Sequence, residues 1–306
     1  MGSPDFAVPT LVALVAAGHE VALVVCQPDK PAGRGRALAA CPVRTAAQQR
    51  QLAVACPERI RGPRGAEFVA RVRALAPDFI VVAAYGKILP PELLAAARQA
   101  PVNVHASLLP RWRGASPIQH AILAGDDETG VSIMRMEEGL DSGGVYTAVR
   151  EPIRPDDTAG TLAARLAALG AEAVVPALAA IAAGVLAPRP QGEVGITVAP
   201  LLGKQDGWLD LARPAEELAR RVRAMDPWPG AHTTLAGVPL KVWRARPLEA
   251  VDGAAGLVVA VGDEVVVACG SGALAIGELQ LAGKKRLAAR EFACGARLIA
   301  GARLGG

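Results

Sequence analysis

An amide and an imidazole stand two residues apart in this chain, at Asn103 and His105, within the run VNVHASLLPRWRG. The run begins as a β-strand, and because side chains alternate between the two faces of a strand, both polar groups point to one side. Asp141, in the loop GLDSGG, offers a carboxylate as a third member. An amide can donate hydrogen bonds to an oxyanion, and an imidazole can exchange a proton near neutral pH. The three residues therefore meet the needs of acyl transfer without a covalent nucleophile.

The same residues also have a simpler interpretation. Asn103 and His105 can be hydrogen-bonded residues at the end of a strand, and Asp141 can be a turn former. The pattern N-x-H by itself does not decide between a catalytic and a structural role.

The bulk composition is that of a globular protein with two domains. The chain has 306 residues, of which 52% are hydrophobic and 20% charged, and these proportions exclude a disordered chain. No run of 18 or more apolar residues is free of charges, Gly and Pro, so we expect no membrane-spanning helix and no membrane partner. The net charge of +4 fits a polyanionic partner without requiring one.

The five cysteines form no C-x-x-C pair, and no histidine lies near them at the spacing of a metal site. We see no secretory signal at the start of the chain. Reduced thiols, a cytoplasmic location and no bound metal are therefore expected.

Apolar runs alternate with helical patterns through the first half of the chain. The expected strands cover residues 21–26, 79–84, 102–105 and 130–136, and the expected helices cover 7–17, 43–52, 66–75, 91–98, 116–124, 158–169 and 171–183. Strands separated by helices are typical of a parallel α/β sheet, so we predict a Rossmann-like catalytic domain over residues 1–185. Such a sheet should open with a strand, and we expect a short one upstream of Met1.

The second half of the chain has a different pattern. Residues 186–203 (LAPRPQGEVGITVAPLLG) have three prolines and no helical period, which predicts a linker. A short amphipathic helix is expected over 214–225, followed by strands over 239–245, 257–261, 264–268 and 273–281. This spacing predicts a small OB-like β-barrel domain over residues 204–306.

Two basic segments are candidates for contact with a nucleic acid. Arg34 and Arg36 lie in the Pro/Gly-rich loop QPDKPAGRGR, and Lys284, Lys285 and Arg286 form a basic trio in the β-rich half. Either segment can be ordinary solvated surface. Next to an OB-like barrel, however, such a trio can hold an RNA backbone, and arginines on a Gly-rich loop can contact phosphates.

The string NVHASLLPRWRG, together with the later GDDETG turn and the DSG loop, resembles the folate-dependent formyltransferase family. The further strings MGSPDFAVP, QPDKPAGRGR, VVAAYGKILP, DPWPGA and LQLAGKKRLAAREFACGARL are similar to the branch of that family that formylates methionyl-tRNA. This resemblance implies transfer of a formyl group from 10-formyltetrahydrofolate to the α-amine of methionyl-initiator tRNA, a step of translation initiation. We also expect a monomer.

The resemblance assigns roles to particular positions. Asn103, His105 and Asp141 take the catalytic positions. The positions implied to line the folate site are Tyr85, Ile88, Leu89, Ser107, Leu108, Leu109 and Pro110. Those implied to contact tRNA are Arg34, Arg36, Lys284, Lys285 and Arg286. The chain departs from the family pattern at Ala106, where Gly or Pro is usual, and at Gly144, where an acidic residue is frequent.

Two alternatives belong to other functional classes. A formyltransferase acting on a small amine, such as glycinamide ribotide or an amino sugar, would lack the barrel or replace it, and residues 204–306 argue against that interpretation. A catalytically idle RNA- or folate-binding module would have lost one of Asn103, His105 and Asp141, and all three are present.

Overall fold

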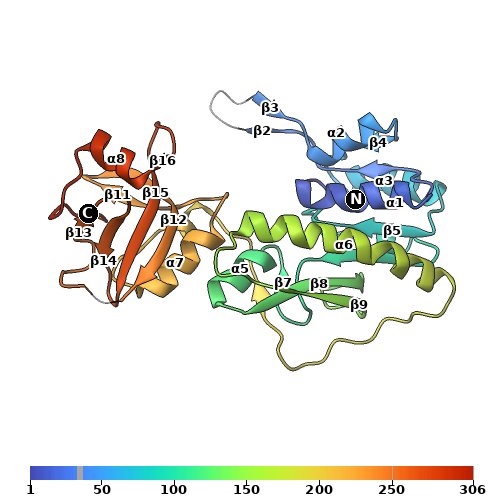
Figure 1. The fold of residues 1–306 in the computed structure, drawn as a ribbon. Coiled ribbons are helices and arrows are strands. Elements are labelled where there is room, and N and C mark those ends of the chain that lie inside the picture. Colours follow the sequence, from blue (N-terminus) through green and yellow to red (C-terminus); the bar gives the residue numbers. More distant parts are fainter. Residues whose placement is uncertain (33–36, 250, 306) are drawn as a thin grey trace. The chain divides into compact units, whose positions relative to one another are not determined.

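The computed structural model describes residues 1–32, 37–249 and 251–305, and the chain divides into two compact units (Figure 1). Unit 1 consists of Met1–Pro117, Glu128–Pro152 and Ala163–Ala199. Unit 2 consists of Ile118–Asp127, Ile153–Leu162 and Pro200–Gly306. The domain boundaries predicted from the sequence, at residues 185 and 204, remain a prediction, because the two units are divided by contacts and not by position along the chain.

The part of the chain that builds unit 1 contains short strands separated by helices. Its elements in chain order are η1 (Asp5–Ala7), α1 (Val8–Ala16), β1 (Val24–Val25), β2 (Lys30–Ala32), β3 (Ala37–Ala39), α2 (Pro42–Gln49), β4 (Val54–Ala55), α3 (Pro63–Ala74), β5 (Phe79–Val82), α4 (Pro91–Leu94), β6 (Ala100–His105), β7 (Arg113–Gly114), β8 (Glu128–Arg135), β9 (Val145–Pro152), α6 (Ala159–Ala182) and β10 (Val198–Ala199). The predicted strands and helices of this region appear, most of them shorter than expected.

A four-stranded sheet in the order β5-β6-β8-β9 carries the centre of unit 1. β5 and β6 are parallel, and so are β1 and β4 in a separate pair. The expectation of a parallel strand over 130–136 is wrong, because β8 runs antiparallel to β6 and forms a hairpin with β9, a strand that was not predicted. The short loop between β8 and β9 can join these two strands only in opposite directions, whereas the longer connection between β6 and β8 allows either direction.

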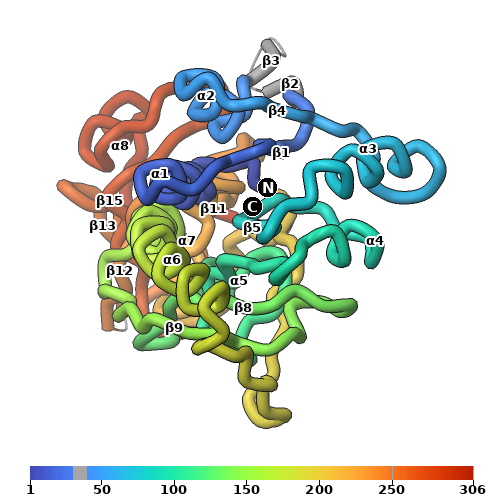
Figure 2. Tube along the Cα trace, turned by 90° about the vertical axis from the view of Figure 1, so that its right-hand side faces the viewer, coloured from blue at the N-terminus to red at the C-terminus, as the bar shows by residue number. Residues whose placement is uncertain are grey.

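The first two residues pair on both sides with strands of unit 1. The backbone N–H of Gly2 donates to the Val25 carbonyl at 2.9 Å, and the Ala83 N–H donates to the Met1 carbonyl at 2.9 Å. Figure 2 accordingly shows the start of the chain between β1 and β5. A cavity of about 690 Å³ lies beside this pairing, lined by residues of α1, β1, β5 and the end of α6. The strand expected upstream of Met1 stays a prediction.

One continuous helix, α6, replaces the two helices predicted over 158–169 and 171–183. Pro176 lies inside it. In length and composition α6 could cross a membrane, with a mean hydropathy of 1.6 in its most apolar window, and this differs from our expectation of no such helix. Its fully buried residues Leu162, Leu166 and Val174 recur at helical spacing, the pattern of a helix that packs in a protein core.

Unit 2 is built around an antiparallel sheet in the order β11-β12-β15-β14-β13, with β16 paired to β15. The elements are α5 (Pro117–Ala124), η2 (Lys204–Gly207), α7 (Ala215–Ala224), β11 (Ala231–Leu235), β12 (Val238–Leu248), β13 (Val258–Val261), β14 (Val265–Ala268), β15 (Ala273–Leu281), β16 (Leu287–Ala288) and α8 (Ala289–Ala296). Leu218, Leu240, Ile276 and Phe292 belong to its apolar core. The predicted β-rich second half is confirmed, and β11, β16 and α8 were not predicted.

Candidate active site

Asn103 and His105 lie near the C-terminal end of β6, a fully buried strand of unit 1. All six residues of β6 are buried, and the exposed fraction is 9% for Asn103 and 5% for His105. The apolar Val102 and Val104 alternate with the two polar residues, so the strand presents one polar and one apolar face. The period-two prediction is confirmed, because both side chains reach the same carboxylate, that of Asp141.

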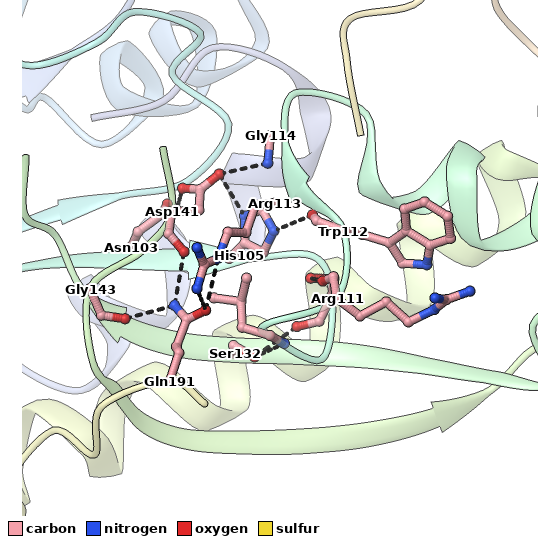
Figure 3. Close-up of polar contacts among 12 residues, drawn as sticks. Asn103, His105, Arg111, Trp112, Arg113, Gly114, Ser132, Asp141, Gly143 and Gln191 are labelled. Carbon is pink, nitrogen blue, oxygen red and sulfur yellow. Dashed lines mark hydrogen bonds and ion pairs between the residues drawn. The ribbon is translucent and has the colours of Figure 1, made fainter. Parts of the chain in front are cut away.

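Asp141 is held where Asn103, His105 and the strand β7 meet (Figure 3). Its Oδ2 accepts a hydrogen bond of 2.9 Å from the Gly114 N–H and lies 3.6 Å from His105 Nδ1. Its Oδ1 accepts a longer hydrogen bond of 3.4 Å from Asn103 Nδ2. The backbone of Asp141 is left-handed, with φ of 47°, a conformation that side-chain-bearing residues adopt at a cost. The structure thus brings together the three residues predicted from the sequence.

The ring of His105 is engaged at both nitrogens. Nε2 lies 3.0 Å from the Trp112 carbonyl, and because a carbonyl can only accept, Nε2 must carry a hydrogen. Nδ1 faces the Asp141 carboxylate, which also only accepts when it is ionised. The hydrogen bond from Nε2 to Trp112 therefore fixes the ring with Nδ1 facing the Asp141 carboxylate, beside the amide of Asn103.

The turn after β6 is held by two buried serines. The Ser107 side chain is fully buried, and its hydroxyl donates to the Arg111 carbonyl at 2.6 Å. The Ser132 hydroxyl, on β8, donates to the Ser107 carbonyl at 2.7 Å and accepts from the Leu109 N–H at 3.2 Å. Ser107 therefore uses its hydroxyl inside the turn, whereas Leu108 and Pro110 are half-buried at its surface.

The other predicted folate residues fall into two groups. Tyr85 and Leu89 are buried in the apolar core beside β5, while Ile88 is 69% exposed. Burial raises the pKa of Tyr85 to about 12, with a smaller contribution from Cys26 and Cys56. Of this group, Ile88 has the side chain that a ligand can reach from solvent.

The predicted tRNA residues are only partly described. Arg34 and Arg36 lie outside the described residues. Lys284 and Lys285 are exposed in unit 2, after β15. Arg286 forms an ion pair with Glu278, lies 3.8 Å from Asp226 and stacks 5.1 Å from the centre of the Trp243 ring. Its charge is therefore partly compensated within the protein.

Residues 186–203 contribute contacts to the site that the sequence did not indicate. β10 pairs in parallel with β7, so that Val198 lies opposite Arg113 and Ala199 opposite Gly114. The Thr197 hydroxyl accepts a hydrogen bond of 2.8 Å from the Trp112 N–H. Gln191 contacts the Asp141 loop. The sequence signal for these contacts was limited to two polar residues, Gln191 and Thr197, in a Pro-rich stretch. This signal does not indicate which residues they contact.

Comparison with known proteins identifies the family of this chain. Residues 1–178 match the family described as "Formyl transferase", and residues 201–297 match "Formyl transferase, C-terminal domain". A methionyl-tRNA formyltransferase from Chromobacterium violaceum is 49% identical over 306 residues, covering 99% of this chain and 98% of that protein. One from Burkholderia pseudomallei is 50% identical over 310 residues, covering 99% and 95%. The chain belongs to the methionyl-tRNA formyltransferase family. The family expected from the sequence motifs is thereby confirmed.

The fold of this formyltransferase family member also matches solved structures. An N-formyltransferase from Helicobacter canadensis, solved with folinic acid and dTDP-3-aminofucose, superposes with a TM-score of 0.66 at 14% identity, over 94% of this chain and 97% of that one. At this level of identity the match concerns the fold alone. The predicted fold class, a Rossmann-like formyltransferase domain followed by a β domain, is confirmed.

Proposed function

We propose that this chain transfers the formyl group of 10-formyltetrahydrofolate to the α-amine of methionyl-initiator tRNA, with Asn103, His105 and Asp141 as catalytic residues. The observation that carries the proposal is the meeting of the three side chains on β6 and the 139–144 loop, with His105 Nδ1 at 3.6 Å and Asn103 Nδ2 at 3.4 Å from Asp141. The relatives near 50% identity over almost their whole length support the tRNA substrate. Folinic acid in the Helicobacter canadensis enzyme supports a folate donor.

The reaction begins when the lone pair of the neutral α-amine attacks the formyl carbon. A C–N bond forms, and the former carbonyl oxygen becomes an oxyanion. Asn103 is suited to stabilise this oxyanion, because its amide has two N–H donors and the contact with Asp141 uses one of them. The tetrahedral intermediate then collapses, breaking the bond from carbon to the donor nitrogen.

His105 and Asp141 would manage charge and protons during these steps. In this proposal a protonated His105 stabilises the developing oxyanion, and Asp141, whose Oδ2 lies 3.6 Å from Nδ1, orients the ring. Asp141 also takes the proton that the amine loses on attack, through its loosely bound Oδ1. Asp141 then returns this proton to the departing tetrahydrofolate nitrogen, so the products are formyl-methionyl-tRNA and tetrahydrofolate.

Positioning supplies the remainder of the rate. Holding the amine next to the formyl carbon converts a bimolecular reaction into a unimolecular one. We assign folate contacts to the exposed Ile88 and the half-buried Leu108 and Pro110, and RNA contacts to Lys284 and Lys285. In this proposal residues 1–185 carry catalysis and residues 204–306 bind tRNA, in a cytoplasmic monomer without a metal.

A direct assay tests the function. The chain is incubated with labelled 10-formyltetrahydrofolate and charged initiator tRNA, with glycinamide ribotide as the competing acceptor. We expect label on the methionyl-tRNA alone. Label on glycinamide ribotide instead would support the small-amine alternative, which the match of residues 201–297 to the C-terminal formyl transferase domain disfavours.

A further inference from the structure

The Asp141 loop is fixed at its backbone by a side chain from outside the predicted catalytic domain. Gln191 Nε2 donates to the Asp141 carbonyl at 2.8 Å and to the Gly143 carbonyl at 2.7 Å (Figure 3). Its two N–H groups therefore hold both ends of the segment Asp141–Gly143. Because Asp141 has a left-handed backbone, its conformation needs such external contacts to persist.

The oxygen of the same amide binds Arg113, on β7. Gln191 Oε1 accepts from Arg113 Nε at 3.0 Å and from the terminal Nη2 of Arg113 at 2.8 Å. Arg113 directly precedes Gly114, whose N–H binds the Asp141 carboxylate at 2.9 Å. Gln191 thus ties the backbone of Asp141 to the strand that holds its side chain.

We propose that Gln191 is a positioning residue for Asp141, acting through the loop backbone and Arg113. The proposal rests on the proposed function, since it concerns the carboxylate assigned there. Gln191 touches none of the reacting groups. It fixes the direction in which the carboxylate faces His105 Nδ1.

The side chain required at this position is narrowly defined. Two carbonyl oxygens need donors and one guanidinium needs an acceptor, and a primary amide supplies both at once. A glutamate at 191 would keep the contact with Arg113 but face the carbonyls of Asp141 and Gly143 with an acceptor. Asparagine would preserve the chemistry and shorten the reach by one methylene group.

A double-mutant cycle in the full-length chain tests the proposal. Gln191→Ala should lower kcat by roughly 10- to 100-fold, the loss expected from a small misplacement of a catalytic group, with the KM for the folate unchanged within about twofold. In an Asp141→Asn background the same substitution should lower kcat by less than about twofold, because effects of residues that act through one another are not additive. Gln99→Ala, at an exposed glutamine just before β6, is the matched control and should leave kcat unchanged.

The outcomes separate this proposal from the proposed function. Two outcomes would overturn the role of Gln191 and leave Asp141 catalytic. The first is that Gln191→Ala lowers kcat by the same factor in both backgrounds. The second is that Gln191→Ala has the kcat of the parent while Asp141→Asn has a lower one. A fully active Asp141→Asn enzyme would overturn both. If thermal unfolding and circular dichroism show that Gln191→Ala is not folded, Gln191→Asn replaces it in the cycle with the same expected results. The kcat of Gln191→Glu should be no higher than that of Gln191→Asn.

Discussion

The Nδ1 atom of His105 lies 3.6 Å from Oδ2 of Asp141, and the two side chains are 5% and 17% exposed. The same carboxylate oxygen accepts the Gly114 N–H, so its position is fixed by the backbone before any substrate binds. A buried imidazole opposite a fixed carboxylate keeps its orientation, and the Trp112 carbonyl holds the other edge of the ring. The ring therefore has one fixed orientation in the site.

Replacing His105 by alanine should remove the positive charge next to the oxyanion. We expect kcat to fall by about 10²- to 10⁴-fold, the usual effect of losing a catalytic proton-transfer group, with folate affinity near that of the parent. Steady-state kinetics with charged initiator tRNA and equilibrium folate binding measure the two quantities. His19→Ala, at an exposed histidine after α1, is the control. Unchanged turnover in His105→Ala would refute the assignment.

Replacing Ser132 by alanine should destabilise the turn that follows β6. The substitution leaves the half-buried Leu109 N–H without its acceptor and the buried Ser107 carbonyl without its donor. Unpaired buried groups of this kind cost about 1–3 kcal/mol of unfolding free energy. Urea unfolding followed by circular dichroism gives the value, and the exposed Ser271→Ala serves for comparison. A loss no larger than that of Ser271→Ala would contradict this role.

Replacing both Lys284 and Lys285 by alanine should weaken tRNA binding and make it less sensitive to salt. Each lost phosphate contact lowers the slope of log Kd against log salt concentration by about one. Arg286→Ala should lower the slope less, because Glu278 and Asp226 already compensate part of that charge. Binding titrations at several salt concentrations measure all three proteins. Equal slopes for the parent and the double variant would exclude these lysines from the RNA interface.

Thiol labelling should follow burial. Burial, and then the hydrogen bond to Cys56, raises the pKa of the fully buried Cys26, and burial raises the pKa of Cys269 to about 11. A raised pKa keeps a thiol protonated at neutral pH, and the thiolate is the nucleophile. Iodoacetamide at pH 7.5 should therefore modify the exposed Cys294 first.

Mass spectrometry of the labelled peptides checks this order of modification. In denaturant all five cysteines should react at similar rates, which controls for the reagent. Modification of Cys26 in the native protein as fast as that of Cys294 would contradict the burial of Cys26, which directly follows β1.

The three residues proposed as catalytic could be predicted from the sequence because their signal is local. Asn103 and His105 are related by strand periodicity alone, and Asp141 lies in a recognisable Gly-flanked loop. The roles of Gln191 and Thr197 were not predicted, because their contacts join residues 78 and 85 positions apart in the chain and leave no local periodicity in the sequence. The segment that holds them has no regular pattern, and its two-residue strand β10 exists only through β7.

Two errors in the fold have equally specific causes. The helix α6 was divided at Gly170, but this glycine lies inside one continuous helix whose packing outweighs its low helical propensity. The antiparallel direction of β8 was missed because the helix between β6 and β8 suggested a parallel crossover, and because β9 was not recognised as a strand. Beyond Tyr146, β9 alternates half-buried with exposed residues and ends with Arg150 and Glu151 before Pro152.

Gly114 contributes no functional group, yet its place in β7 restricts what evolution or an engineer can change around it. Its φ is 120°, and a methyl group at its Cα would lie 2.6 Å from the Ala199 carbonyl oxygen. Any side chain at this position would push β10 away from β7. It would also displace Thr197 and the segment that leads back to Gln191. Gly114 has no side chain, yet substitutions around it are tolerated only while β7 and β10 keep their close pairing. Mutant libraries that vary this site should therefore leave Gly114 unchanged.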